Sequence, residues 1–200
     1  MHVWRARLHR WFAPLAARCP LSPNAITLIA LGLNATAAFL LYRGEWIAAI
    51  VLVIVGGLAD AFDGIVARVQ EKSSKYGDFL DHFADRISDT LIVSGWLIGN
   101  GVRVEILIGA VICVTLNGYI GTQIEATWHE RNYDSVGRGE FVLALIVFPL
   151  VSHILGLTGT AALRFAGFTV AEWMALLLIV FALIGIVQRL ALARRLEKQA

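Results

Sequence analysis

Apolar stretches long enough to cross a membrane recur along this chain, and they constrain its fold more than any other feature. The hydrocarbon core of a bilayer is ~30 Å thick, and a helix needs about 20 apolar residues to span it. Six such stretches occur, at about 24–42, 46–68, 75–98, 103–127, 140–157 and 169–191. The mean hydropathy of +0.71 argues against an ordinary soluble domain. We therefore predict an all-α integral membrane protein with six transmembrane helices.

The distribution of Lys and Arg predicts the orientation of these spans. With an even number of spans, both termini and the loops 69–75 and 128–139 lie on one side. That side carries thirteen of the 17 basic residues, whereas the other side carries Arg43, Arg103 and Arg164. Cytoplasmic loops are enriched in basic residues. We therefore expect a multi-pass protein of the inner (cytoplasmic) membrane, with both termini in the cytoplasm.

The first nineteen residues have the pattern of a helix that lies on the membrane surface. Trp4, Leu8, Trp11 and Leu15 recur at roughly helical spacing, and arginines occupy the positions between them. This pattern is typical of an interfacial amphipathic helix on an anionic leaflet. We divide the chain into this juxtamembrane helix at 1–19 and a six-span domain at 20–200. The basic residues then face the membrane, and no nucleic-acid partner is expected.

Acidic residues are concentrated in the middle of the chain, inside the predicted membrane. Seven of the 15 acidic side chains lie between positions 60 and 89. Asp60 and Asp63 share one face of the second span, and Asp81 and Asp85 share one face of the third. Asp63 and Asp81 lie at equal distances from the intervening turn, and Asp60 and Asp85 lie at nearly equal distances. Antiparallel spans can therefore bring the four carboxylates together, open to the cytoplasmic half of the membrane.

Carboxylates in hydrocarbon are costly, so such a cluster indicates a function. Hard cations such as Mg²⁺ or Mn²⁺ bind carboxylate oxygens and often keep open positions for phosphate. Two ions held in this way form a clamp suited to displacement at phosphorus. Three alternatives remain at this point: hydrogen bonds between protonated acids of neighbouring helices, an intramembrane carboxylate cation transporter, and a polyprenyl-type transferase. The last of these uses different acidic motifs and more spans.

The residues from 60 to 85 read D-x-x-D-G-x-x-A-R, then eight residues, then G-x-x-x-D-x-x-x-D. This pattern resembles the signature of the CDP-alcohol phosphatidyltransferases, and every fixed position is present. The resemblance implies transfer of a phosphatidyl-type group from a CDP-linked lipid to an alcohol hydroxyl, with release of CMP. It assigns Asp60, Asp63 and Asp81 as metal ligands, and Asp85 as the base and a further ligand. It also implies a homodimer.

The remaining motif positions and two neighbouring segments are predicted to bind the CDP-lipid donor. Ser22 and Pro23 have the types expected at a helix N-terminus, which can bind phosphate through its free N–H groups. We expect Ser73 to cap the third span and Gly77 to lie opposite Gly64. The predicted donor-binding residues are Asn24, Thr27, Gly64, Ala67, Arg68, Ser74 and Gly77.

The acceptor alcohol is less constrained by the sequence. Arg86, Arg131 and Arg138 lie on the cytoplasmic side of the later spans and are candidates to bind a phosphorylated acceptor, such as inositol phosphate or glycerol phosphate. The alternative within the family is a transferase from a CDP-linked polar alcohol to a lipid alcohol. Asp89 is expected to pair with Arg86, and Asp78 to line the nucleotide entrance.

Overall fold

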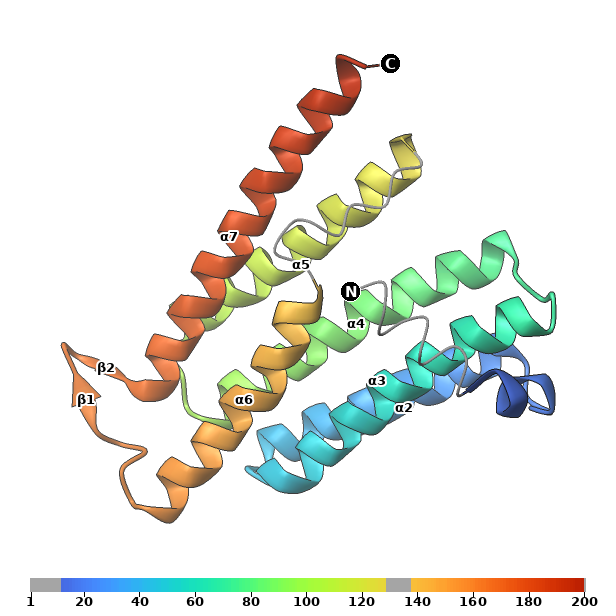
Figure 1. The fold of residues 1–200 in the computed structure, drawn as a ribbon. Coiled ribbons are helices and arrows are strands. Elements are labelled where there is room, and N and C mark those ends of the chain that lie inside the picture. The colour runs from blue at the N-terminus through green and yellow to red at the C-terminus, as the bar shows by residue number, and fades with distance from the viewer. Residues whose placement is uncertain (1–11, 129–137, 200) are drawn as a thin grey trace.

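The computed structural model describes residues 12–128 and 138–199 of the chain. Its long helices begin and end close to the predicted spans (Figure 1). They are α2 (Pro23–Tyr42), α3 (Trp46–Val69), α4 (Lys75–Gly99), α5 (Val104–Trp128), α6 (Arg138–Leu157) and α7 (Val170–Glu197). The last helix extends six residues beyond the prediction, because Ala, Leu and Arg continue the helix past the apolar stretch.

Four of these helices, α2, α3, α5 and α7, are long and apolar enough to cross a membrane by length and composition. The chain is thus a helical, multi-pass membrane protein. Helix α4 falls outside this group because Lys75, Arg86 and several aspartates interrupt its apolar sequence. In α6 the apolar segment, Leu143–Leu157, is shorter than any of these four helices.

A short hairpin departs from the expectation of an all-α chain. Strands β1 (Arg164–Phe165) and β2 (Phe168–Thr169) pair antiparallel, with Arg164 opposite Thr169. The two residues between them, Ala166 and Gly167, both have positive φ, 50° and 82°. Two-residue hairpin turns need such angles, and glycine adopts them without strain. The hairpin precedes α7 and lies far from the α3–α4 turn (Figure 1).

Helix α2 is the scaffold of the N-terminal half. It packs along both α3 and α4, whereas α3 and α4 scarcely approach each other. Gly95 and Gly99 of α4 allow the close approach, since a Cβ at these positions would collide with the carbonyl oxygens of Ala38 and Leu41. Small residues at this spacing are common where membrane helices meet. Helix α5 packs mainly on α7 and α4, and α6 packs mainly on α3.

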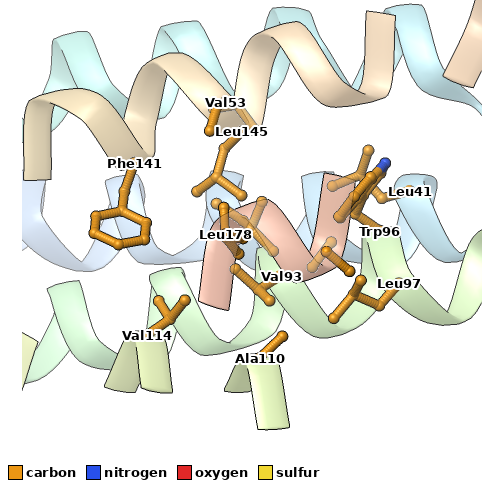
Figure 2. Close-up of a cluster of buried hydrophobic side chains, with 14 of the residues drawn as sticks. Leu41, Val53, Val93, Trp96, Leu97, Ala110, Val114, Phe141, Leu145 and Leu178 are labelled. Atoms are coloured by element: carbon orange, nitrogen blue, oxygen red, sulfur yellow. The ribbon is translucent and has the colours of Figure 1, made fainter. Parts of the chain in front are cut away.

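The hydrophobic core lies in the half of the bundle away from the α3–α4 turn. All six long helices contribute to it, and Trp96, Leu97 and Leu178 are among its fully buried side chains (Figure 2). The indole Nε1 of Trp96 donates a hydrogen bond to Ser152 Oγ of α6, at 3.1 Å. This core therefore does not extend to the opposite end of the bundle, where α2 begins, α3 ends and α4 begins.

Residues 12–17 form a short helical segment, and Ala16 is fully buried against the start of α2 and the end of α3. The side-chain amide of Gln70 fixes this segment by donating to the carbonyls of Ala16 (2.8 Å) and Cys19 (2.9 Å). Most of the amphipathic helix predicted at 1–19, namely residues 1–11, lies outside the described residues.

Candidate active site

An open cleft of about 180 Å³ lies between the ends of α3 and α4, beside the start of α2. Its lining brings together residues from three helices and one turn. They are Pro23, Asn24 and Thr27 of α2; Asp63, Gly64, Ala67 and Arg68 of α3; Lys72 and Ser73 of the turn; Ser74, the N-cap of α4; and Gly77, Asp78 and Asp81 of α4. All seven predicted donor-binding residues are in this set, and Asp78 lines the cleft as expected.

The start of α2 is held at the cleft by its cap. Ser22 Oγ accepts a hydrogen bond from the backbone N–H of Ala25 (3.2 Å), and Pro23 occupies the first helical position. One turn later, Thr27 Oγ1 donates to Asp63 Oδ2 at 2.5 Å and also lies 3.1 Å from the carbonyl oxygen of Pro23. Thr27 therefore orients a carboxylate that faces the cleft, a role that the sequence did not indicate.

The four signature aspartates lie close together at two levels. Asp63 is 5% exposed, and the carboxylates of Asp60 and Asp81 are near enough to repel its charge. One turn further along α4, Asp85 joins Asp81 and His82: each of the three offers a ligand atom, and these atoms lie within 4.8 Å of one another. Asp63 and Asp81 line the cleft, whereas Asp60 and Asp85 are outside its lining.

This group of residues fits a divalent cation by its donor chemistry. It consists mainly of carboxylate oxygens, which are the ligands that Mg²⁺ and Mn²⁺ prefer. A charged Asp63 at 5% exposure, beside the carboxylates of Asp60 and Asp81, needs a compensating positive charge. A cation held by Asp60, Asp63, Asp81 and Asp85 would supply it.

The turn between α3 and α4 is shaped at Glu71, whose φ is 54°. The N–H of Lys72 bonds to the carbonyl of Ala67 (2.8 Å) and that of Glu71 to Arg68 (3.3 Å), which is the Schellman pattern that usually has glycine at the left-handed position. Lys72 Nζ in turn donates to Gln70 Oε1 (2.7 Å). The turn therefore places Lys72 in the lining of the cleft.

The prediction that Ser73 caps α4 is wrong. Ser74 is the N-cap, and its Oγ accepts from the backbone N–H of Gly77 at 3.0 Å. The cap moves one residue because α4 begins at Lys75. Ser73 lies in the cleft lining, and the Ser74 hydroxyl keeps its own proton to donate.

The prediction that Gly77 lies opposite Gly64 is also wrong. A Cβ at Gly77 would lie 3.2 Å from both Asn24 Oδ1 and Ser74 Oγ, so Gly77 makes room for the start of α2. A Cβ at Gly64 would instead meet the guanidinium of Arg68, at 3.5 Å. The pairing differs because α2, not α3, is the packing partner of α4.

Comparison with known families agrees with this geometry. The family model described as CDP-alcohol phosphatidyltransferase matches residues 20–193. The chain belongs to the CDP-alcohol phosphatidyltransferase family. The match includes the whole signature and all six long helices up to the last turn of α7.

Two relatives within this family carry named activities. An archaetidylinositol phosphate synthase of Pyrococcus horikoshii is 37% identical over 86 residues, 43% of this chain and 46% of that protein. A phosphatidylinositol phosphate synthase of Corynebacterium glutamicum is 31% identical over 155 residues, 74% of this chain and 68% of that protein. The chain thus covers less than half of the first relative and about two thirds of the second.

Solved structures of the family have the same fold. The phosphatidylinositol phosphate synthase of Mycobacterium tuberculosis in apo form matches with a TM-score of 0.69 and 26% identity, over 90% of this chain and 93% of that one. The same enzyme with CDP-DAG bound matches with a TM-score of 0.71 and 24% identity, over 92% and 94%. The helical arrangement is therefore that of the family.

The structure describes only some of the residues that were predicted to bind the acceptor alcohol. Arg86 lies beside the site, and its guanidinium nitrogens are 3.9 Å from a carboxylate oxygen of Asp85 and 3.5 Å from one of Asp89. The pair with Asp89 was predicted from the i,i+3 spacing. Its guanidinium rests on Gly118 of α5, where a Cβ would collide with it. Arg131 lies outside the described residues, and Arg138 is the first residue of α6.

Two residues near the site were missed by the sequence analysis. His82 lies with Asp81 and Asp85, and its Nε2 is 3.9 Å from Asp78 and 4.0 Å from Glu125. Arg189 of α7 donates to the backbone carbonyl of Asn117 (2.6 Å) and to its side chain. The i,i+4 spacing of Asp78 and His82 was the available signal for His82. Nothing in the sequence alone paired Arg189 with α5.

Proposed function

We propose that this chain transfers a phosphatidyl-type group from a CDP-linked lipid to the hydroxyl of a polar alcohol and releases CMP. The donor would be of the CDP-diacylglycerol or CDP-archaeol type. The observation that carries the proposal is the convergence of the signature on one cleft: Asp63, Gly64, Ala67, Arg68, Gly77 and Asp81 line it together. Asp60 is close enough to act on the charge of Asp63, and Asp85 lies with Asp81 and His82.

In the proposed reaction, the acceptor hydroxyl attacks the phosphorus that carries the lipid. Asp85 takes the hydroxyl proton as the new P–O bond forms. The bond from that phosphorus to the bridging oxygen breaks, and CMP leaves with this oxygen. Arg68 and Lys72, both in the cleft lining, would bind the pyrophosphate oxygens. Asn24 and the N-terminus of α2 would contact the nucleotide end.

Asp60, Asp63, Asp81 and Asp85 would hold the divalent cations, which we propose to be two Mg²⁺ or Mn²⁺ ions. When bound, such ions neutralise negative charge on the phosphate groups. Thr27 contributes by fixing the orientation of the Asp63 carboxylate through its 2.5 Å hydrogen bond.

The acceptor that we favour is an inositol phosphate, with glycerol phosphate as the second choice. The relatives named above are an archaetidylinositol phosphate synthase and a phosphatidylinositol phosphate synthase. Arg86 and Arg189 both approach the stretch of α5 between Asn117 and Gly121, and this places positive charge on the α5 side of Asp85. Arg131 and Arg138 would add to it. A phosphorylated alcohol suits such a group of bases.

We further propose that all six long helices span the membrane, with both termini and the cleft on the cytoplasmic side. The support is the packing of α4 and α6 among the four apolar helices and the excess of Lys and Arg on that side. The membrane would be the cell's inner membrane, and the protein would be a homodimer.

The test is CMP release by the purified full chain in detergent micelles with Mg²⁺. The donor is CDP-diacylglycerol or CDP-archaeol labelled in the cytidine, and the acceptors are inositol phosphate, glycerol phosphate, inositol and serine, each tested alone. We expect CMP with inositol phosphate and none after chelation of the metal. A parallel reaction with CDP-inositol and diacylglycerol tests the reverse arrangement of donor and acceptor.

The outcomes separate the candidates. CMP release with glycerol phosphate alone would overturn the acceptor and keep the reaction. No CMP with any acceptor, combined with Mg²⁺ uptake into sealed vesicles that contain the protein, would replace the transferase by a cation transporter.

A further inference from the structure

A second polar contact joins the three site helices, deeper in the membrane than the cleft. Asn34 of α2 and Ser88 of α4 are 7% and 4% exposed. Asn34 Nδ2 donates to Ser88 Oγ at 3.2 Å. The Oδ1 atom of the same side chain is only 2.4 Å from where a Cβ of Gly56 on α3 would be, so the two would collide. One amide thus touches both α3 and α4, and we refer to Asn34, Gly56 and Ser88 as the Asn34 bridge.

The Asn34 bridge lies two helical turns below the hydrogen bond between Thr27 and Asp63 and has a similar arrangement. Thr27 and Asn34 are seven residues apart on α2, as are Asp63 and Gly56 on α3, and Asp81 and Ser88 on α4. Seven residues correspond to a rise of about 10 Å in each helix. Asp60 and Asp85 lie between the two levels in the sequence of their helices, each about one turn from the bridge. These are the two signature carboxylates that are not part of the cleft lining.

The separation of α3 and α4 depends on what lies between them. The two helices scarcely touch, and each packs on α2 instead. At the upper level, Thr27 bonds to α3. At the lower level, the Asn34 amide contacts α3 on one side and α4 on the other. A shift of about 1 Å in the positions of reacting groups can cost about 100-fold in rate.

We propose that Asn34 is a positioning residue, which sets the distance between Asp60 and Asp85 by spacing α3 from α4 at the floor of the acidic site. It acts through these carboxylates and touches neither substrate nor cation. The inference rests on the proposed function, because it assigns a role within that reaction. A residue that only stabilised the bundle would affect folding and leave the cation requirement unchanged.

The variants are chosen to separate spacing from stability. Asn34→Ala removes the amide, Ser88→Ala removes one hydrogen bond and keeps the packing, and Gly56→Ala inserts a methyl group where the amide oxygen lies. In the double variant Asn34→Ala with Gly56→Ala, the collision is absent. Thr36→Ala is the matched control, because Thr36 is exposed on the same helix and bonds only to the carbonyl of Gly32 within α2.

Two readouts are measured on the full chain in detergent. The first is the rise in the unfolding temperature Tm with added Mn²⁺, without any substrate. The second is kcat and the Mn²⁺ concentration for half-maximal CMP release. We expect Asn34→Ala and Ser88→Ala to need about fivefold more Mn²⁺ for the same rise in Tm, the size expected from one interhelical hydrogen bond. Thr36→Ala should behave as the wild type. Gly56→Ala should lower Tm. The double variant should have a higher Tm than Gly56→Ala, but it should still need more Mn²⁺ than the wild type.

Each outcome decides between the two roles. If Asn34→Ala and Ser88→Ala lower Tm but keep the wild-type Mn²⁺ response and kcat, the proposal is overturned and the bridge is structural. If Asn34→Ala does not fold, Ser88→Ala and the double variant decide in its place. If the wild type responds to Mn²⁺ but releases no CMP, the proposed function fails and the Tm readout still tests the spacing. If Mn²⁺ leaves the wild-type Tm unchanged, the cation assignment and this proposal both fail.

Discussion

Two buried acids at opposite ends of the bundle have opposite surroundings. Glu172, in the first turn of α7, is 1% exposed. It accepts hydrogen bonds from the backbone N–H of Thr169 (2.8 Å) and from Arg103 Nε (2.7 Å). Asp63, in the cleft, is 5% exposed. It accepts from the Thr27 hydroxyl and is repelled by the carboxylates of Asp60 and Asp81.

The difference separates an acid whose charge is compensated within the fold from one that we propose to bind a cation. Glu172 closes a capping box with Thr169 and has its counter-charge within the chain, so its burial is compensated as soon as the protein folds. Asp63 gains repulsion from its charged neighbours, which a cation would convert into attraction. The contrast predicts opposite responses of stability and activity to substitution at the two ends.

The largest effect is expected at Asp85. Asp85→Asn should lower kcat by about 10²–10⁴-fold, because the amide cannot take the proton of the acceptor hydroxyl. Binding of the CDP-lipid should change little, which is measured by competition with labelled donor. Near-normal kcat in Asp85→Asn would show that another group is the base.

The next effect tests the two buried acids directly. Glu172→Gln should lower the free energy of unfolding by about 1–2 kcal/mol, since Arg103 is half-exposed and water compensates part of the loss. The kcat should stay at the wild-type value. Thermal unfolding and CMP release on the same sample measure both.

Asp63→Asn is the matched variant in the cleft. It should raise Tm in the presence of a chelator, because one of three repelling charges is gone, while it abolishes metal-dependent CMP release. The comparison breaks down if Asp63→Asn lowers Tm in chelator as much as Glu172→Gln does.

A smaller effect is expected from the hydroxyl that orients Asp63. Thr27→Val keeps the shape of the side chain and removes its hydrogen bond, so kcat/KM should fall by about tenfold. Thr27→Ser should restore most of it. A Thr27→Ser variant that is as impaired as Thr27→Val would indicate that packing of the methyl group, and not the hydroxyl, is what matters.

The smallest effects concern two helix caps, one at each end of the molecule. Ser74→Ala and Thr169→Ala each remove a side-chain bond to a backbone N–H and should cost about 1 kcal/mol of stability. Only Ser74→Ala should also raise the KM for the CDP-lipid, because Ser74 lines the cleft. An equal rise in KM for both variants would point to a general loss of stability.

The helices and the composition of the cleft could be predicted from the sequence. Long apolar stretches with Ser22 and Pro23 at a helix start give boundaries within a few residues, since burial in lipid and capping are local properties. The signature spacing placed Asp63 and Asp81 in one cleft. The orientation of the spans, the number that cross the membrane and the dimer remain predictions.

What the sequence could not predict depends on contacts between distant segments. The prediction that Gly77 lies opposite Gly64 requires α3 and α4 to be direct neighbours, and Thr27 was predicted only as a contact to the donor. In the structure α2 packs on both helices, which places Asn24 beside Gly77 and Thr27 on Asp63. The approach of Arg189 to Asn117 likewise needs the packing of α7 on α5.

The place of α2 before α3 and α4 in the chain has a consequence for biosynthesis. Chains are made and membrane-inserted from the N-terminus, so α2 enters the bilayer before α3 and α4 emerge from the ribosome. Thr27 is then already present when Asp63 arrives, and Asn34 when Ser88 arrives. Asp63 and Ser88 of the later helices therefore each meet a hydrogen-bond partner that is already in the membrane.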